Sequence, residues 1–208
     1  MKTNLTSMNI LVDSSGSMAS IASDMVGSLN QLVNENRELD FLVTYSLFSD
    51  VYQPIFIDKP IREVIQFDLK PSGRTALIES ACKMIDEVGI RLSAMPEEER
   101  PEKVMFVIVT DGEENASAQE YTLERLKEKI KHQRDVYNWL FLYLGANQDS
   151  ISVAQQYGIA PDKAINYSTN EKGMRRYKEM LVRKMQQVSC AAPTALQNVA
   201  WDDKDRKK

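Results

Sequence analysis

The chain has 208 residues, a formal net charge of −4 and 43% hydrophobic residues. These totals are typical of one soluble globular domain, and the small negative charge gives no electrostatic reason to expect nucleic acid as a partner. We expect neither a membrane span nor a signal peptide, because no apolar run is long enough and the N-terminus lacks a basic-then-apolar layout. Two distant cysteines, Cys82 and Cys190, indicate reduced thiols and a cytoplasmic location.

Strands and helices are predicted to alternate along the chain. Apolar and β-branched runs predict strands at residues 8–12, 39–48, 51–57, 104–110, 138–144 and 164–167. Apolar residues at helical spacing predict helices at residues 21–36, 77–92, about 123–130, 150–157 and 174–188. This order predicts a Rossmann-like α/β fold, an open and mostly parallel sheet with helices on both faces.

Three details refine this prediction. The turn-forming pair Ser49-Asp50 lies between two β-rich runs, which predicts a hairpin whose second strand is antiparallel and at the sheet edge. The run at 104–110 is the most apolar in the chain, so we place it at the sheet centre. Ser117 followed by Glu120 matches a capping box for the helix near 123–130.

Oxygen-bearing side chains follow the two strands that we expect to be most buried. Asp13, Ser15 and Ser17 come directly after the first strand, and Asp111 follows the run at 104–110. In open parallel sheets, ligands bind outside the carboxyl ends of the strands where the strand order reverses. With Thr75, these residues offer oxygen donors only, which favours Mg²⁺, with Mn²⁺ or Ca²⁺ as alternatives.

These residues resemble the motifs of a known family. Asp-Ser-Ser-Gly-Ser at 13–17 resembles the D-x-S-x-S motif of von Willebrand factor A (vWA) domains, which bind metal at a metal-ion-dependent adhesion site (MIDAS). Gly73-Arg-Thr75 resembles the threonine loop of that family, and Thr110-Asp-Gly112 resembles its second-aspartate motif. The resemblance covers about residues 5–190 as one vWA domain, followed by a polar tail at 191–208, and implies a small intracellular member of bacterial or phage type.

The resemblance also implies a role for each residue. The counterparts of Ser15, Ser17 and Thr75 bind the metal directly or through water, whereas those of Asp13 and Asp111 act mostly through water or hydroxyl contacts. An acidic residue of the partner often completes the coordination. The resemblance therefore implies a protein-binding module without catalytic residues, whose partner presents an Asp or Glu, and it implies neither nucleic acid nor membrane as a partner.

Several alternatives stay open from the residues alone. Asp13, Ser15 and Thr75 are also suitable helix N-caps. The same site could serve a metal-dependent phosphohydrolase that uses Asp13 as nucleophile or metal ligand, or a structural component of an assembly with an ATPase. The single histidine, His132, argues against a histidine-based triad or a His-ligated zinc site. The oligomeric state and the packing of Trp201 in the tail are also open.

Overall fold

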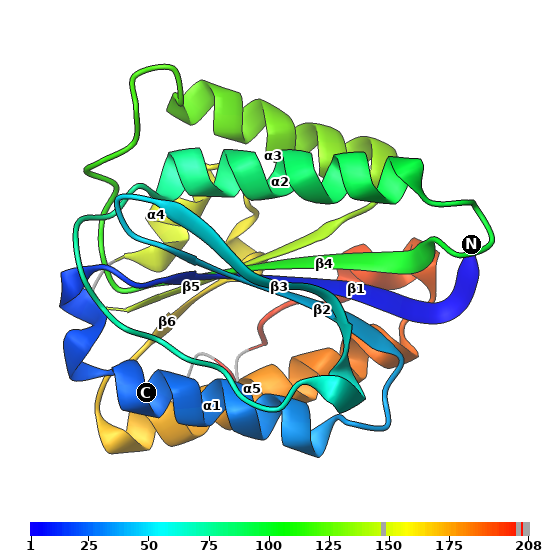
Figure 1. The fold of residues 1–208 in the computed structure, drawn as a ribbon, viewed down its shortest axis with the longest axis horizontal. Coiled ribbons are helices and arrows are strands. Elements are labelled where there is room, and N and C mark those ends of the chain that lie inside the picture. Colours follow the sequence, from blue (N-terminus) through cyan, green and yellow to red (C-terminus); the bar gives the residue numbers. More distant parts are fainter. Residues whose placement is uncertain (147–148, 203–204, 206–208) are drawn as a thin grey trace.

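The protein is represented by a computed structural model that describes residues 1–146, 149–202 and 205. The described residues form a six-stranded sheet in the order β3-β2-β1-β4-β5-β6 (Figure 1). The strands are β1 (Lys2–Asp13), β2 (Phe41–Phe48), β3 (Tyr52–Pro60), β4 (Pro101–Thr110), β5 (Leu140–Ala146) and β6 (Ala164–Tyr167). The helices are α1 (Ala22–Glu35), α2 (Leu77–Ala94), α3 (Leu123–Tyr137), α4 (Ser150–Gln156) and α5 (Glu171–Cys190).

The predicted fold class is confirmed. All neighbouring strands pair in parallel except β3, which is antiparallel to β2 at the edge of the sheet. Figure 1 shows α1 and α5 on one face of the sheet, with α2, α3 and α4 on the other. Parallel strands covered on both faces need continuous apolar side chains, and the structure accordingly has one hydrophobic core on each side of the sheet.

The two central strands bring the predicted site together. β1 pairs with β2 on one side and with β4 on the other, so the strand order reverses between β1 and β4. Val12 lies opposite Val109 in this pairing, which places the ends of both strands at the same level. Asp13 and Asp111 therefore lie at one edge of the sheet, at its topological switch point.

Two details of the predicted elements are wrong. The first strand begins at Lys2 and not at residue 8, because Thr6 and Ser7 are polar residues that are nonetheless buried between paired neighbours. The N-cap of α3 is Thr122, whose side chain accepts a hydrogen bond from the backbone N–H of Arg125. Ser117 is not the cap, since its hydroxyl donates to Glu114 instead.

The segment after α5 packs onto the body of the domain. A short 3-10 helix spans Pro193–Asn198, and the side chains of Leu196, Val199 and Trp201 are buried in the core between the sheet and α1 and α5. The division into a domain at 5–190 and a tail at 191–208 stays a prediction, and residues 203–204 and 206–208 lie outside the described part. None of the described helices is long and apolar enough to cross a membrane.

Candidate metal centre

Asp13 is the most buried residue of the predicted site. It ends β1 and has no exposed surface. One carboxylate oxygen, Oδ1, accepts a hydrogen bond of 2.7 Å from the backbone N–H of Ser15. The other, Oδ2, accepts one of 2.6 Å from the hydroxyl of Thr110 at the end of β4. The carboxylate is therefore fixed from both central strands.

The surroundings of Asp13 have opposing effects on its ionisation. Burial raises the pKa of Asp13 above its ordinary value of 3.8, because a charge is poorly solvated inside a protein. The hydrogen bonds from Thr110 and Ser15 lower the pKa, and the charge of Asp111 raises it. A cation beside two buried or half-buried carboxylates would favour their charged forms.

A chain of hydrogen bonds joins three more of the predicted residues. The hydroxyls of Ser15 and Ser17 lie 3.0 Å apart, and the Ser17 hydroxyl donates a bond of 2.6 Å to Oδ1 of Asp111. Because the Ser17 hydroxyl donates its proton to Asp111, the Ser15 hydroxyl is the donor in the bond between the two serines. Both hydroxyl oxygens keep lone pairs that could bind a cation.

Gly112, just after the end of β4, lies beside side-chain oxygens from two other segments of the chain. A Cβ atom on this residue would lie 3.3 Å from Oγ1 of Thr75, 3.6 Å from Oγ of Ser17 and 3.8 Å from Oδ2 of Asp13. The missing side chain thus leaves room beside donors that come from the end of β1, from the segment that follows it and from the loop before α2. All five predicted residues, Asp13, Ser15, Ser17, Thr75 and Asp111, are brought together here.

The loop that carries Thr75 is held by the β2–β3 hairpin. The carboxylate of Asp50 accepts hydrogen bonds of 2.9 Å from both the backbone N–H and the guanidinium of Arg74, and these contacts hold the pKa of Asp50 below its ordinary value. Gly73 has a positive φ of 77°, and a Cβ there would lie 2.1 Å from Oδ2 of Asp50. Only glycine fits this turn without strain.

The loop after Asp111 also holds Thr75 and the start of α2. The side-chain oxygen of Asn115 accepts a hydrogen bond of 3.0 Å from the backbone N–H of Thr75, and the backbone N–H of Asn115 donates to the Thr75 carbonyl. Glu114 accepts a bond of 2.7 Å from the N–H of Ile78 in the first turn of α2. The loop after β4 is therefore bonded directly to the loop before α2.

Sequence patterns alone did not assign the bonding roles of Thr110, Glu114 and Asn115. Their roles depend on partners that are distant in the chain, so no local spacing marks them, although the position of Thr110 at the end of a buried strand is a weak signal. Of the capping alternatives, only Ser15 occupies an N-cap position, at the start of the 3-10 helix Gly16–Ser20. Ala76 is the N-cap of α2, and no side-chain cap is found at the 3-10 helix that follows Ser15.

The donor set fits a hard cation. The site offers two carboxylates and three hydroxyls, and hard cations such as Mg²⁺ prefer oxygen ligands and keep several waters. In the described part of the chain, no group of three His, Cys, Asp or Glu side chains is placed to hold a metal. A cation at this site would therefore depend on the serine and threonine oxygens as well as the carboxylates.

Comparisons with known proteins identify the fold. No protein-family model matches the sequence, and no curated protein sequence matches it. Solved structures with a similar fold include proximal thread matrix protein 1 from the mussel byssus with a zinc-occupied MIDAS motif, at 14% identity and a TM-score of 0.60. They also include the ArnB paralog VWA2 from Sulfolobus acidocaldarius, at 14% identity and a TM-score of 0.53.

Coverage differs among these structures. The similarity to the mussel protein covers 86% of this chain and 45% of that chain, and the similarity to VWA2 covers 88% and 45%. This chain therefore spans less than half the length of those two proteins. Manganese-loaded TRAP protein from Plasmodium vivax matches at 19% identity and a TM-score of 0.56, over 83% of this chain and 72% of that chain. At these identities the likeness establishes architecture rather than activity, and the chain has the fold of a von Willebrand factor A domain.

Proposed function

We propose that this chain is a divalent-metal-dependent protein-binding module. Asp13, Ser15, Ser17, Thr75 and Asp111 would hold the cation, and the cation would bind an Asp or Glu carboxylate of a partner protein. The cation supplies a positive charge for that carboxylate. The chain's own residues fix its position and leave one side open to the partner, so the module needs no catalytic residue.

The observation that carries this proposal is the convergence of oxygens around Gly112. Oxygens of Thr75, Ser17 and Asp13 all lie within 3.8 Å of the position that a Cβ on Gly112 would take. Ser17 is exposed and Asp111 is half-buried, whereas Asp13 is fully buried. The site thus has a buried floor and an accessible rim, which a ligand that approaches from outside requires.

We propose Mg²⁺ as the resident cation. A donor set of hydroxyls and two carboxylates leaves positions for water, and Mg²⁺ binds in this way more readily than Ca²⁺, which takes more protein ligands. The related fold from the mussel byssus holds zinc and the one from Plasmodium vivax holds manganese. Competition between Mg²⁺, Mn²⁺ and Zn²⁺ is therefore part of the test.

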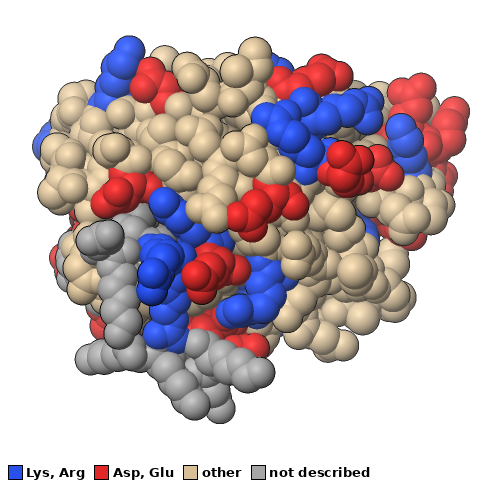
Figure 2. All heavy atoms as spheres, turned by 90° about the horizontal axis from the view of Figure 1, so that it is seen from below, with Lys and Arg blue, Asp and Glu red and all other residues tan. Residues whose placement is uncertain are grey.

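The proposed partner is a protein. Figure 2 shows Lys and Arg interspersed with Asp and Glu on the face formed by α1 and α5, an arrangement unlike the single-sign patch that nucleic acid or an anionic membrane requires. We propose the cytoplasm as the location, because both cysteines are free and Cys82 is buried away from any disulfide partner.

Titration calorimetry with Mg²⁺ tests the metal site, and two serine variants make a matched pair. Ser15→Ala removes a hydroxyl that lies 3.0 Å from Ser17 within the site. Ser14→Ala removes the neighbouring hydroxyl, which donates instead to the carbonyl of Phe48 in β2. We expect Ser15→Ala to weaken Mg²⁺ binding by about tenfold or more, and Ser14→Ala to leave it close to that of the unchanged chain.

Peptides test the second half of the proposal. With Mg²⁺ present, the chain should bind members of a peptide library that contain Glu or Asp, and binding should disappear with a chelator or when the acid is replaced by Gln or Asn. Metal binding without such selectivity contradicts the carboxylate step. Release of phosphate from an aryl phosphate, lost in Asp13→Asn, would support the phosphohydrolase instead.

A further inference from the structure

Tyr167 carries a buried hydroxyl close to the proposed metal site. The residue ends β6 and is only 5% exposed. Within the described part of the chain, its hydroxyl has no hydrogen-bond partner. Such a group carries a desolvation penalty unless a ligand or water pairs with it, so its persistence needs an explanation.

The sheet places Tyr167 at the same end as Asp111. Tyr167 pairs in register with Ala146 of β5, and both residues belong to the core that also contains Val109 of β4. Thr110 of β4 lies opposite Gly145 of β5, and Gly145 lies opposite Asn166 of β6, so Asp111 and Tyr167 directly follow paired positions at the same end of the sheet. Tyr167 therefore approaches the site from the face that α1 and α5 cover.

Electrostatics agree with this placement. Burial raises the pKa of Tyr167 well above its ordinary value, and Tyr177, Asp111 and Asp13 each add to the rise. This direction agrees with the position of Tyr167 at the same end of the sheet as the two carboxylates. The phenol consequently stays protonated at neutral pH and can act as a hydrogen-bond donor.

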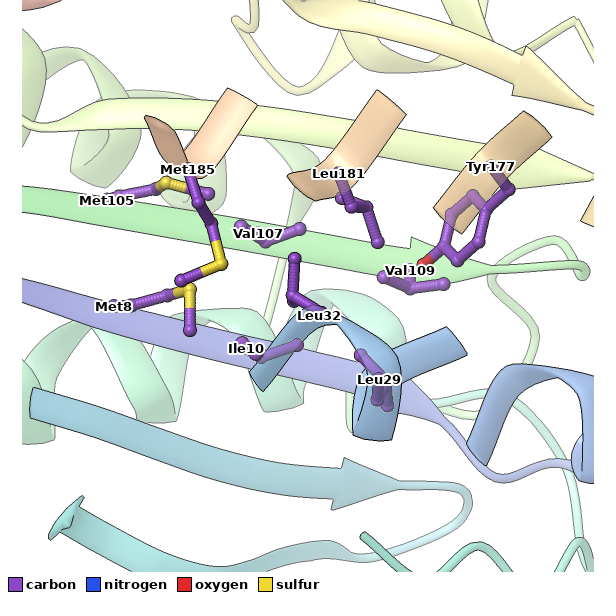
Figure 3. Close-up of a pocket in the computed structure, with 10 residues that line it drawn as sticks. All are labelled: Met8, Ile10, Leu29, Leu32, Met105, Val107, Val109, Tyr177, Leu181 and Met185. Atoms are coloured by element: carbon purple, nitrogen blue, oxygen red, sulfur yellow. The ribbon is translucent and has the colours of Figure 1, made fainter. Parts of the chain in front are cut away.

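Tyr177 provides an internal comparison. Its ring lies 4.8 Å from that of Tyr167, and its hydroxyl is likewise buried without a partner among the described residues. However, Tyr177 lines a cavity of about 10 Å³ between the sheet and the helices α1 and α5, and Figure 3 shows its oxygen pointing toward Val109. The other residues that line this cavity are apolar, so a water there would lack the two or more polar partners it needs.

We infer that Tyr167 is a positioning residue of the metal site, whose hydroxyl donates a hydrogen bond to the coordination shell of the cation beside Asp111. Groups that contact a metal only through its ligands or waters orient those ligands and raise metal affinity. Water retained by Mg²⁺ is a suitable acceptor for the phenol. The inference rests on the proposed metal site and assigns it a residue from β6, which none of the sequence motifs includes.

Two conservative variants separate this role from simple packing. Tyr167→Phe and Tyr177→Phe each delete one unpaired buried hydroxyl and keep the ring. In chelator, both variants should unfold at the same urea concentration as the unchanged chain or at a higher one. With Mg²⁺, calorimetry should show affinity reduced by about tenfold in Tyr167→Phe and unchanged in Tyr177→Phe.

A spectroscopic signal gives a second measurement that does not depend on affinity. Addition of Mg²⁺ should change the near-ultraviolet circular dichroism of tyrosine, because the environment of one phenol changes. This difference should persist in Tyr177→Phe and disappear in saturated Tyr167→Phe.

The outcomes separate the two proposals. If the unchanged chain binds no divalent cation, the proposed function fails. If the unchanged chain binds Mg²⁺ and Tyr167→Phe matches it in affinity and spectrum, only the inference about Tyr167 is overturned. Equal losses of affinity in both tyrosine variants also overturn it, because they would indicate a general effect of packing between α5 and the sheet.

Discussion

The hydroxyl of Thr110 donates a hydrogen bond of 2.6 Å to the buried carboxylate of Asp13, and this bond joins the ends of the two central strands. The same hydroxyl accepts a bond of 3.1 Å from the backbone N–H of Gly112. Thr110 thus connects the proposed metal ligand to the turn that leaves room for the cation.

We predict that Thr110→Val destabilises the metal-free protein. Valine keeps the shape of threonine but removes the hydroxyl that donates to Oδ2 of the buried Asp13 carboxylate, so the free energy of unfolding should fall by about 1.5–3 kcal/mol. Urea denaturation in the presence of chelator measures this change. Thr110→Ser retains the hydroxyl and should lose less than half as much; an equal loss in both variants would show that the methyl group matters more than the hydrogen bond.

The sequence predicted the parts of the site that depend on local order. Asp13 and Asp111 each follow a buried strand, and parallel strands bring such ends to one edge of the sheet. The roles of Thr110, Glu114 and Asn115 could not be predicted in this way, because each bonds to a residue on another loop. The order of strands decides those contacts, and no spacing along the chain encodes it.

Competition between local and distant partners explains the wrong capping box. Ser117 and Glu120 have the right spacing, but the Ser117 hydroxyl donates to Glu114, and its oxygen accepts from the N–H of Glu79 in α2. These contacts keep Ser117 at the start of α2. Thr122 caps α3 instead, and a threonine with Arg125 at the third position after it lacks the Glu or Gln that would have marked it.

Glu114 should stabilise the loop after Asp111. Its carboxylate accepts hydrogen bonds from the backbone of Ile78, Ala116 and Ser117, and so serves as the cap that the Ala76 side chain cannot provide. We predict that Glu114→Ala lowers the free energy of unfolding by about 1–2 kcal/mol, the usual cost of a lost cap. Urea denaturation followed by circular dichroism measures it.

The neighbouring acid supplies the control for charge. Glu113 is exposed, and Glu113→Ala removes the same charge from the same loop. We expect this variant to stay within about 0.5 kcal/mol of the unchanged chain. Similar effects in the two variants would mean that net charge near the site, and not capping by Glu114, controls stability.

Two glycines should respond to alanine in opposite directions. Gly73→Ala places a Cβ 2.1 Å from Oδ2 of Asp50 at a φ of 77°, so it should lower the free energy of unfolding by more than about 1 kcal/mol. Gly89 lies within α2, and a Cβ there would meet only the Gln133 side chain at 3.5 Å. Gly89→Ala should therefore raise the free energy of unfolding by about 0.5–1 kcal/mol. Thermal unfolding of both variants measures these changes. If both variants unfolded at the same temperature as the unchanged chain, the prediction would be wrong.

Trp201 attaches the end of the described chain to the domain. Its indole N–H donates a bond of 2.9 Å to the Lys163 carbonyl, and its backbone N–H donates to the backbone carbonyl of Asp162. The Nζ atom of Lys184 lies 5.3 Å from the ring centroid. Because the ring is buried in the core, Trp201→Ala should lower the free energy of unfolding by about 3–5 kcal/mol.

Replacing the same residue by phenylalanine separates burial from hydrogen bonding. Trp201→Phe keeps an aromatic ring and leaves the Lys163 carbonyl without the indole donor, so it should fall between the unchanged chain and Trp201→Ala in urea denaturation. The Lys184 side chain, only 1% exposed, also forms an ion pair of 2.9 Å with Asp205. If Trp201→Ala changed the free energy of unfolding by less than about 0.5 kcal/mol, the segment after α5 would not be docked in solution.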